Sequence, residues 1–198
     1  MCNTKSINKD CLVLELKECL RENPIMEVDY NALPIDKLIK HIVSTHHRYI
    51  QNNVELISSF AEKVAKVHGK HAPETLVIHK LWIELVNDLM EHLRNEEKNL
   101  FPSMVHWSFN YSSANVSKAL QDDITMILGD FEIEHEKVGD LIHQIQTLSN
   151  NYTPPEWACN TYKALYFKLN EFQSDLMHHI YLENNILFPK SLYLQSIK

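Results

Sequence analysis

Apolar residues recur at alternating steps of three and four along four long stretches of the chain, the spacing that gives an α-helix one apolar face. The first stretch carries a stripe that begins and ends with histidine: His47, Ile50, Val54, Ile57, Ala61, Val64 and His68. It starts at Pro34 and is followed by Gly69, the residue favoured just past a helix C-terminus. The pattern predicts a first helix over residues 34–68.

Three further stripes predict three more helices of similar length. The second contains Ile78, Trp82, Leu85, Leu89, His92 and Glu96, after Pro73 and Glu74 in its first turn. The third contains Leu120, Ile124, Ile127, Phe131, Glu134, Val138, Leu141, Ile145 and Leu148, beside a neighbouring row of Leu128, His135 and Ile142. The fourth contains Leu165, Leu169, Phe172, Leu176, His179, Glu183 and Ile186.

Turn-forming residues separate these stretches. Residues 105–115 read as the loop before the third helix. In the next connection, Thr153 suits an N-cap, Pro154 the first helical position and Glu156 the third, so the fourth helix is predicted to begin there. Four helices joined by such loops predict an all-α fold, an up-down-up-down four-helix bundle over residues 33–198.

Residues 1–32 form an N-terminal extension in this scheme. They contain one short amphipathic helix over residues 10–22, which Asn23-Pro24 should end. Only three glycines occur in 198 residues, which also favours long helices over hairpins.

The second and fourth stripes carry the same motif, H-x-x-x-E-x-x-x-L-F-P, at residues 92–102 and 179–189. Residues four apart lie on one helix face, so each copy aims an imidazole and a carboxylate at one point. Polar groups on an apolar stripe are costly unless something compensates, and we interpret that compensation as metal binding.

His47 and His135 complete the set, because the polar positions of the four stripes follow one another at intervals of about 45 residues and can meet at one level of a bundle. His68 lies 21 residues from His47, roughly 31 Å along a helix at 1.5 Å per residue. His47 and His68 therefore cannot serve one site.

Imidazole and carboxylate without thiolate favour iron or manganese. If Glu96 and Glu183 both bridge, two metals share four imidazole nitrogens and four carboxylate oxygens, which gives four protein donors each. An oxo or hydroxo bridge would add a fifth donor and leave one open position. A ferritin-like site would repeat Glu-x-x-His, and that spacing occurs once, from Glu132 to His135. We therefore predict two oxo- or hydroxo-bridged iron ions.

Several alternatives stay open at this point. His46 and His178 adjoin predicted ligands; the internal repeat favours His179, whereas His47 over His46 rests on the heptad alone. Glu134 either assists the metals as a neighbouring or proton-handling carboxylate or points to a partly wet crevice. Ordinary structural or surface roles are expected for five further histidines of the bundle: His68, His71, His79, His106 and His143.

Composition excludes other classes of function. A net charge of −7 without a cluster of Lys and Arg argues against nucleic acid as a partner. No apolar run approaches the roughly 18 residues of a membrane span, and the N-terminus lacks an apolar signal core, so a cytoplasmic protein is expected. The four cysteines form no C-x-x-C pair, and reduced thiols are expected.

Several segments, including EHLRNEEKNLFP, EIEHEKVGDLI, NNYTPPEWACNTYKALY and DLMHHIYLENNILFPKSL, resemble the haemerythrin-like domain of the RIC (Repair of Iron Centres) family. The resemblance covers residue 34 to the C-terminus. It implies a non-haem di-iron protein of nitrosative and oxidative stress that helps restore iron-sulfur clusters, donates iron to apo iron-sulfur proteins and also handles nitric oxide.

By position, the family ligands fall on the same six residues: His47, His92, Glu96, His135, His179 and Glu183. Glu134 matches a family carboxylate near the metals.

Two departures from related patterns bear on function. An oxygen-carrying haemerythrin would place a histidine four residues after His135, where this chain has Gly139. Full-length family members carry an N-terminal domain with an adjacent Cys-Cys, which is not found in residues 1–32. The alternatives to iron donation are an enzyme that reduces nitric oxide and a carrier or sensor that binds O2 or nitric oxide.

Overall fold

The structure, a computed structural model, describes residues 28–110 and 118–193 of the chain. The chain divides into two units at the junction of Ala32 and Leu33, and every helix described below belongs to the second unit. The predicted helix over residues 10–22 lies outside the described residues, as do Cys2, Cys11 and Cys19. Cys159 is an exposed free thiol.

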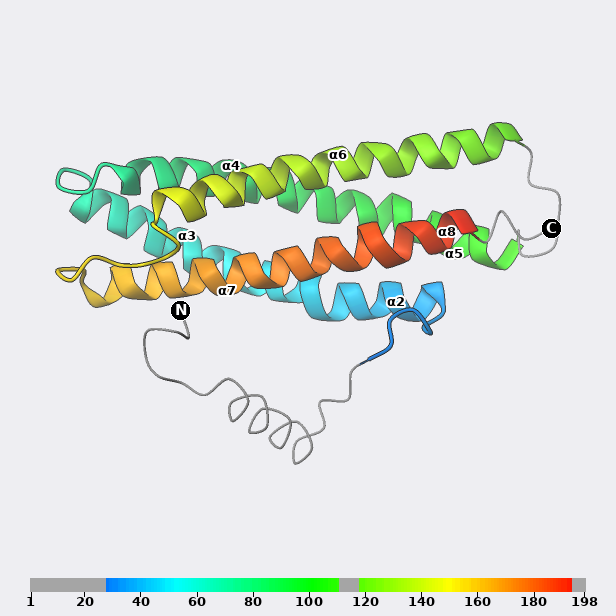
Figure 1. Cartoon of the computed structure of the whole chain (residues 1–198), viewed down its shortest axis with the longest axis horizontal. Coiled ribbons are helices and arrows are strands. Elements are labelled where there is room, and N and C mark those ends of the chain that lie inside the picture. Colours follow the sequence, from blue (N-terminus) through cyan, green and yellow to red (C-terminus); the bar gives the residue numbers. More distant parts are fainter. Residues whose placement is uncertain (1–27, 111–117, 194–198) are drawn as a thin grey trace, which may run out of the picture. The chain divides into compact units, whose positions relative to one another are not determined.

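Four long helical runs form the bundle (Figure 1). In chain order the runs are α2 (Ile35–Ile42), the π-helical segment η2 (Val43–His47) and α3 (Arg48–His68); α4 (Glu74–Asn95), η3 (Glu96–Leu100) and α5 (Phe101–Asn110); α6 (Lys118–Leu148); and α7 (Asn160–Leu182), η4 (Glu183–Leu187) and α8 (Phe188–Tyr193). Helices α3 and α6 each pack against both α4 and α7. The predicted all-α, up-down-up-down bundle is confirmed, and the two helices with the repeated motif lie diagonally opposite each other.

Large apolar side chains fill the half of the bundle that ends in the α3–α4 and α6–α7 connections. Trp82 is 0% exposed and meets Phe172 edge to face, with ring centroids 4.9 Å apart. Its Nε1 donates a hydrogen bond of 2.8 Å to Oγ of Ser58, so the one polar atom of the indole is satisfied in the core. Among the described residues, no helix is long and apolar enough to cross a membrane.

Helix α6 presents a slightly different face to the core than predicted. Leu128 and His135, from the neighbouring row, are buried, whereas Ile127 and Leu148 are each 37% exposed. Glu134 also lies on the exposed side. The buried face of α6 lies between the two predicted rows, because the apolar face of an α-helix is wider than one row of side chains.

The predicted loop over residues 105–115 is wrong at its start, because α5 continues to Asn110. Phe101 and Met104, in the first turn of α5, are 3% and 0% exposed. Their burial anchors the start of this helix in the core. Residues 111–115 lie outside the described part of the chain.

The fourth helix begins later than predicted, at Asn160 with Cys159 as its N-cap, rather than at Pro154. A residue that precedes proline is pushed out of the α conformation. Pro154 precedes Pro155, so it cannot open a regular helical turn.

The connection before α7 contains three successive residues with left-handed backbone conformations. Asn150, Asn151 and Tyr152 have φ of 50°, 53° and 57°. Asparagine tolerates this region, but a bulky residue reaches it only when its surroundings hold it there. Tyr152 is 8% exposed, its backbone N–H donates to Oγ of Ser149 at 3.1 Å, and its hydroxyl donates to Oε1 of Gln173.

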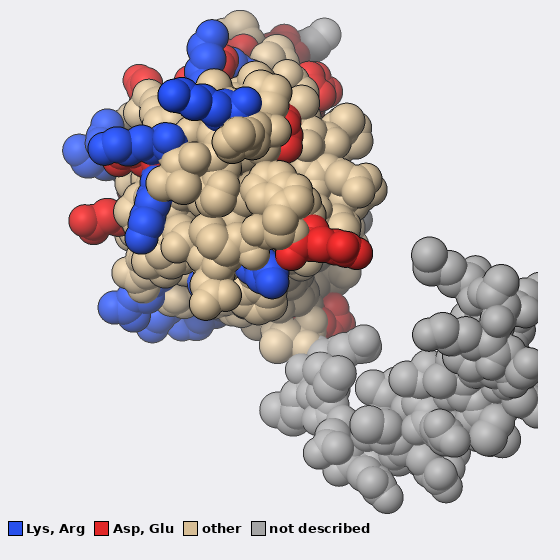
Figure 2. Space-filling model, turned by 90° about the vertical axis from the view of Figure 1, so that its left-hand side faces the viewer, with Lys and Arg blue, Asp and Glu red and all other residues tan. Residues whose placement is uncertain are grey.

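Figure 2 looks onto the bundle end that carries the connections between α3 and α4 and between α6 and α7. Acidic and basic side chains both occur there, around a centre of neither charge. This end of the bundle shows no continuous basic patch of the kind that binds nucleic acid.

The first helical run ends at His68 as predicted, but Gly69 is there for another reason than conformational freedom. Its φ is −57°, an ordinary right-handed value. A Cβ at this position would lie 2.5 Å from the carbonyl oxygen of Ala65 and 2.8 Å from side-chain atoms of Leu76. Glycine is required by this close approach between the end of α3 and the start of α4.

We therefore expect Gly69→Ala to destabilise the metal-free protein by about 1–3 kcal/mol, the usual cost of overpacking. Gly129→Ala is the matched control, because a Cβ at Gly129, within α6, meets nothing within 4 Å. That change should stabilise the protein by about 0.5–1 kcal/mol through helix propensity. Denaturant unfolding measures both, and an unchanged or raised stability in Gly69→Ala would contradict the assignment.

Candidate metal centre

All six residues predicted as metal ligands lie at one level of the bundle. They are His47 on η2, His92 on α4, Glu96 on η3, His135 on α6, His179 on α7 and Glu183 on η4. Their exposed fractions run from 0% to 4%. The four helical runs therefore bring together, in the interior of the bundle, the residues that the sequence pattern singled out.

Glu96 turns its two carboxylate oxygens toward different histidines. Its Oε1 lies 3.2 Å from Nε2 of His92, and its Oε2 lies 3.4 Å from Nε2 of His47. The two imidazoles belong to neighbouring helical runs, so one carboxylate stands between two separate donor groups.

Glu183 repeats this arrangement from the diagonally opposite run. Its Oε1 lies 2.9 Å from Nε2 of His179, and its Oε2 lies 3.2 Å from Nε2 of His135. Both glutamates therefore have the geometry of bridging carboxylates.

Two groups of four donors result, and they share both glutamates. One comprises His47, His179, Glu96 and Glu183, and the other His92, His135, Glu96 and Glu183. Within each group, one ligand atom from every residue lies within 4.8 Å of the others. The paired imidazoles face each other through Nε2, at 3.2 Å in the first group and 2.9 Å in the second.

Three of the four carboxylate oxygens are left without a hydrogen bond. Both oxygens of Glu96 and Oε2 of Glu183 are buried without a hydrogen-bond partner. Buried carboxylates of this kind are costly unless they are paired or coordinate a metal. The buried histidines and glutamates are thus compatible with a metal site.

The glutamates of the metal-free protein are held in their ionised form. Burial alone would raise the pKa of Glu183, but the charges and contacts of His179 and His135 hold it well below its usual value. Burial and the charge of Glu183 would likewise raise the pKa of Glu96. Contacts with His47 and His92 outweigh both effects and bring the pKa of Glu96 below its usual value.

Two of the histidines hold protons tightly. Burial acts to lower the pKa of His92, but contacts with Glu96 and Glu134 outweigh it and raise the pKa to about 9. The pKa of His47 is also raised, against burial, by Glu96 and Glu183. A metal ion binds neutral imidazole, so it must displace these protons when it enters.

Three of the four histidines have their outer nitrogen fixed by an oxygen. The contacts of Nδ1 join His47 to Oε1 of Glu97 at 2.8 Å, His92 to Oε2 of Glu134 at 2.6 Å and His135 to Oδ1 of Asn184 at 2.7 Å. An oxygen acceptor makes Nδ1 the donor, which leaves Nε2 as the ligand atom. Nδ1 of His179 has no hydrogen-bond partner.

Sequence reasoning missed Glu97 and Asn184. The signal was present in the repeat, because each directly follows a predicted bridging glutamate and each can accept a hydrogen bond. This signal could not be used from sequence alone, because the turn that follows each glutamate is a π turn, which is wider than an α-helical turn.

Both copies of the repeated motif leave the α conformation at their glutamate. η3 begins at Glu96 and η4 at Glu183. A proline inside a helix clashes with the carbonyl four residues earlier and cannot donate to it. For Pro102 and Pro189 these carbonyls belong to residues 98 and 185, inside the two π segments, where the wider turn lets the helix continue past the proline.

The phenylalanines of the repeated motif cover the site. Phe101 stacks on the ring of His47 with centroids 5.6 Å apart, and Phe188 stacks on His135 at 5.9 Å. Both phenylalanines are at most 3% exposed. Each copy of the motif thus supplies a ligand pair and an apolar cover for a histidine of another run.

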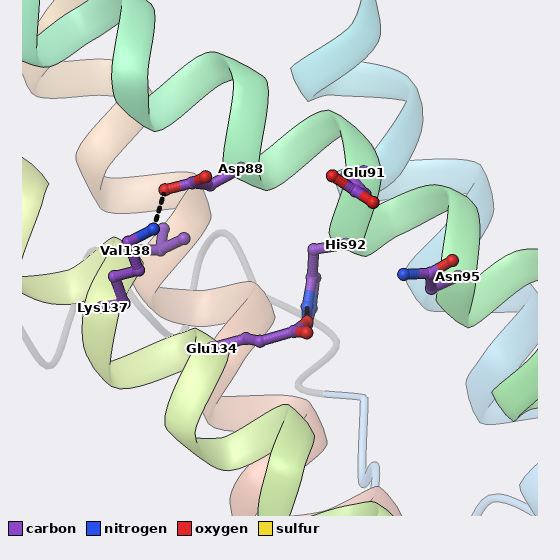
Figure 3. A pocket seen from close by; sticks show the side chains of 7 residues that line it. All are labelled: Asp88, Glu91, His92, Asn95, Glu134, Lys137 and Val138. Carbon is purple, nitrogen blue, oxygen red and sulfur yellow. Dashed lines mark hydrogen bonds and ion pairs between the residues drawn. The ribbon is translucent and has the colours of Figure 1, made fainter.

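A crevice of about 260 Å³ reaches the site beside His92. Figure 3 shows His92 on α4 and Glu134 on α6 in contact at this crevice. The ion pair of Asp88 and Lys137 joins the same two helices and also lines the crevice. The side chain of Glu134 is 49% exposed, and Nζ of Lys137 lies 2.7 Å from Oδ2 of Asp88. Glu134 therefore contacts a predicted ligand and also lines a crevice that is open to solvent.

His46 and His178, which the sequence left open as alternatives to His47 and His179, lie outside both groups of four donors. His46 is 3% exposed, and its Nδ1 lies 2.9 Å from Oδ1 of Asp175. Among the described residues, the remaining histidines of the bundle also lie outside these groups, namely His41, His68, His71, His79, His106 and His143.

Comparison with known proteins agrees with this geometry. Residues 38–191 match the family described as "Hemerythrin HHE cation binding domain". The chain is 33% identical over 190 residues to the "Iron-sulfur cluster repair protein YtfE" of Yersinia pseudotuberculosis serotype IB (strain PB1/+) and to the protein of the same name from Yersinia pestis (strain Pestoides F). Each alignment covers 96% of this chain and 80% of the relative. The chain therefore belongs to the hemerythrin HHE cation-binding family and, within it, to the YtfE type of iron-sulfur cluster repair protein.

Proposed function

We propose that this chain holds two iron ions between its bridging glutamates and takes part in the repair of damaged iron-sulfur clusters. The observation that carries the proposal is the pair of fully buried glutamates, Glu96 and Glu183, each of which faces two imidazoles. The Yersinia relatives are named as iron-sulfur cluster repair proteins.

The donor set supports iron. Each group offers two imidazole nitrogens and two carboxylate oxygens, without thiolate. Such donors suit iron better than structural zinc or copper(I). Four protein donors leave positions of a six-coordinate ion open, so two ions held here are available for binding small molecules or for transfer.

Iron is cargo as well as cofactor in this proposal, and apo iron-sulfur proteins are its receivers. The crevice beside His92 opens one side of the site to solvent. Glu134 lines that crevice and accepts a hydrogen bond from Nδ1 of His92, so its carboxylate is placed to steady the ligand and to receive a cation or a proton that leaves on this side.

A second candidate is the reduction of nitric oxide at the same ions. The same crevice gives a diatomic molecule access to His92. Nitrous oxide formed by the reduced protein in more than stoichiometric amount distinguishes this reaction from iron donation.

The central prediction concerns the bridging glutamates. The iron-reconstituted protein should hold two iron ions per chain and restore activity to a cluster-depleted enzyme. Glu96→Ala with Glu183→Ala removes the shared donors of both groups and should abolish iron binding and repair together. Metal analysis and the activity of the restored enzyme are the two measurements.

Glu55→Ala with Glu62→Ala serves as control, because both glutamates are exposed on α3. This variant should match the wild type. The proposal fails if free ferrous iron at equal concentration restores the enzyme and the iron-loaded protein does not, or if the purified protein holds a single zinc ion.

The second prediction concerns Glu134. Glu134→Gln keeps the shape but removes the charge that holds Nδ1 of His92, and loss of such an outer contact weakens metal binding about 10- to 100-fold. Competition with a chelator measures this change. Glu136→Gln, an exposed neighbour on α6, should leave the affinity unchanged, and an equal effect of the two changes would exclude a specific role for Glu134.

The third prediction concerns pH. The pKa of His92 is raised to about 9 from an ordinary 6.5 in the metal-free fold. The stabilisation from its protonated form is therefore complete below pH 6.5 and is lost as pH rises toward 9. Unfolding free energy of the metal-free protein should decline over this range, and the decline should be smaller in His92→Gln. Stability that rises between pH 6.5 and 9 would contradict the raised pKa.

A further inference from the structure

A second cluster of histidines lies beside the buried groups. It consists of His41 on α2, His46 on η2 and His178 on α7. The ring centroid of His46 lies 6.0 Å from that of His41, 5.1 Å from that of His178 and 5.9 Å from that of His179. The cluster therefore adjoins the buried centre on the side of His179.

The rings of this cluster are spaced like those of the proposed iron ligands. In the two buried groups, the paired imidazoles have centroids 4.9 Å and 4.6 Å apart and planes inclined at 74° and 62°. His46 and His178 lie 5.1 Å apart at 80°, and His41 and His46 lie 6.0 Å apart at 81°. The centroid distance and inclination of the first pair are close to those of the ligand pairs, whereas His41, which is half-buried, lies farther from His46. The ligand atoms of the three rings do not all lie within the 4.8 Å that joins those of each buried group, so the rings must draw together around an ion.

His46 already has the contacts of a ligand histidine. Its Nδ1 lies 2.9 Å from Oδ1 of Asp175, which makes Nδ1 the donor, as in the contacts of His47 and His92 with carboxylates. Its Nε2 is buried and has no hydrogen-bond partner, although His46 is only 3% exposed. A buried polar atom without a partner is costly, and a bound cation would satisfy it.

The local structure explains why these side chains meet. His41, near the end of α2, and His46, in η2, are five residues apart, and the wider turn of a π segment, with hydrogen bonds from residue i to i+5, brings residues at this spacing close together. Asp175 and His178 lie one turn apart on α7. His178 is exposed and borders a groove that also contains Asp175, so a cation can reach the cluster from solvent.

Two electrostatic features favour a cation here. Burial and the neighbouring His46 and His178 lower the pKa of His41, which favours the neutral form of imidazole that a cation binds. Asp175 supplies a carboxylate directly behind His46.

We propose that His41, His46 and His178 form a third cation site, separate from the two buried groups, which binds one divalent first-row ion. Imidazole donors without thiolate suit ions such as Co²⁺, Zn²⁺ and Fe²⁺. The site lies between solvent and His179, so it is the position that an ion occupies before it enters, or after it leaves, the buried centre. This last role rests on the proposed function; the cation site itself does not.

The test counts Co²⁺ equivalents bound by the full, metal-free chain in equilibrium dialysis. The wild type should bind three per chain. His41→Gln with His178→Gln should lose one equivalent and keep two. His71→Gln with His143→Gln, a pair of exposed histidines outside the cluster, is the matched control and should keep all three.

The variant Glu96→Ala with Glu183→Ala separates this proposal from the proposed function. It should keep one equivalent, and His46→Gln added to it should abolish that equivalent while circular dichroism still reports the helical fold. Only two equivalents in the wild type, or a third that persists in His41→Gln with His178→Gln, would overturn the third site. If the wild type binds three Co²⁺ equivalents but its iron-loaded form does not restore the cluster-depleted enzyme, the result counts against the proposed function alone.

Discussion

The central constraint on this fold is the burial of two glutamates in the middle of a helical bundle. Glu96 and Glu183 are 0% exposed and ionised, a state that is strongly unfavourable without compensating charge. Four imidazoles from four helical runs supply that compensation, and bound cations would supply it more completely by displacing the protons of His92 and His47. The helices must therefore meet at one level, and the motif must point inward from diagonally opposite runs.

The fold and the inner site were largely predictable because both depend on short-range spacing. The stripes predicted four helices, and the step of four residues from His92 to Glu96 and from His179 to Glu183 predicted two inward-facing pairs. Both rest on α-helical periodicity, which is read directly from sequence.

Features that depart from this periodicity could not be predicted in the same way. The π turns at Glu96 and Glu183 shift every later residue relative to a 3.6-residue pattern, so Glu97 and Asn184 could not be placed. The partner of His46 is Asp175, 129 positions away, and no local pattern connects them. The start of α7 at Asn160 depends on the conformation that Pro155 imposes on Pro154, which outweighed a good capping sequence.

The internal repeat gives the two halves of the site the same inner donors but different outer contacts. Glu134 precedes His135, and His46 precedes His47, so they occupy corresponding positions. Glu134 holds Nδ1 of His92, whereas His46 turns to Asp175 and leaves Nδ1 of His179 without a partner. An imidazole whose outer nitrogen is fixed is the better oriented and more basic ligand. The two groups of donors are therefore unequal, and the one that contains His179, which lies next to the His46 cluster, has the less firmly oriented imidazole.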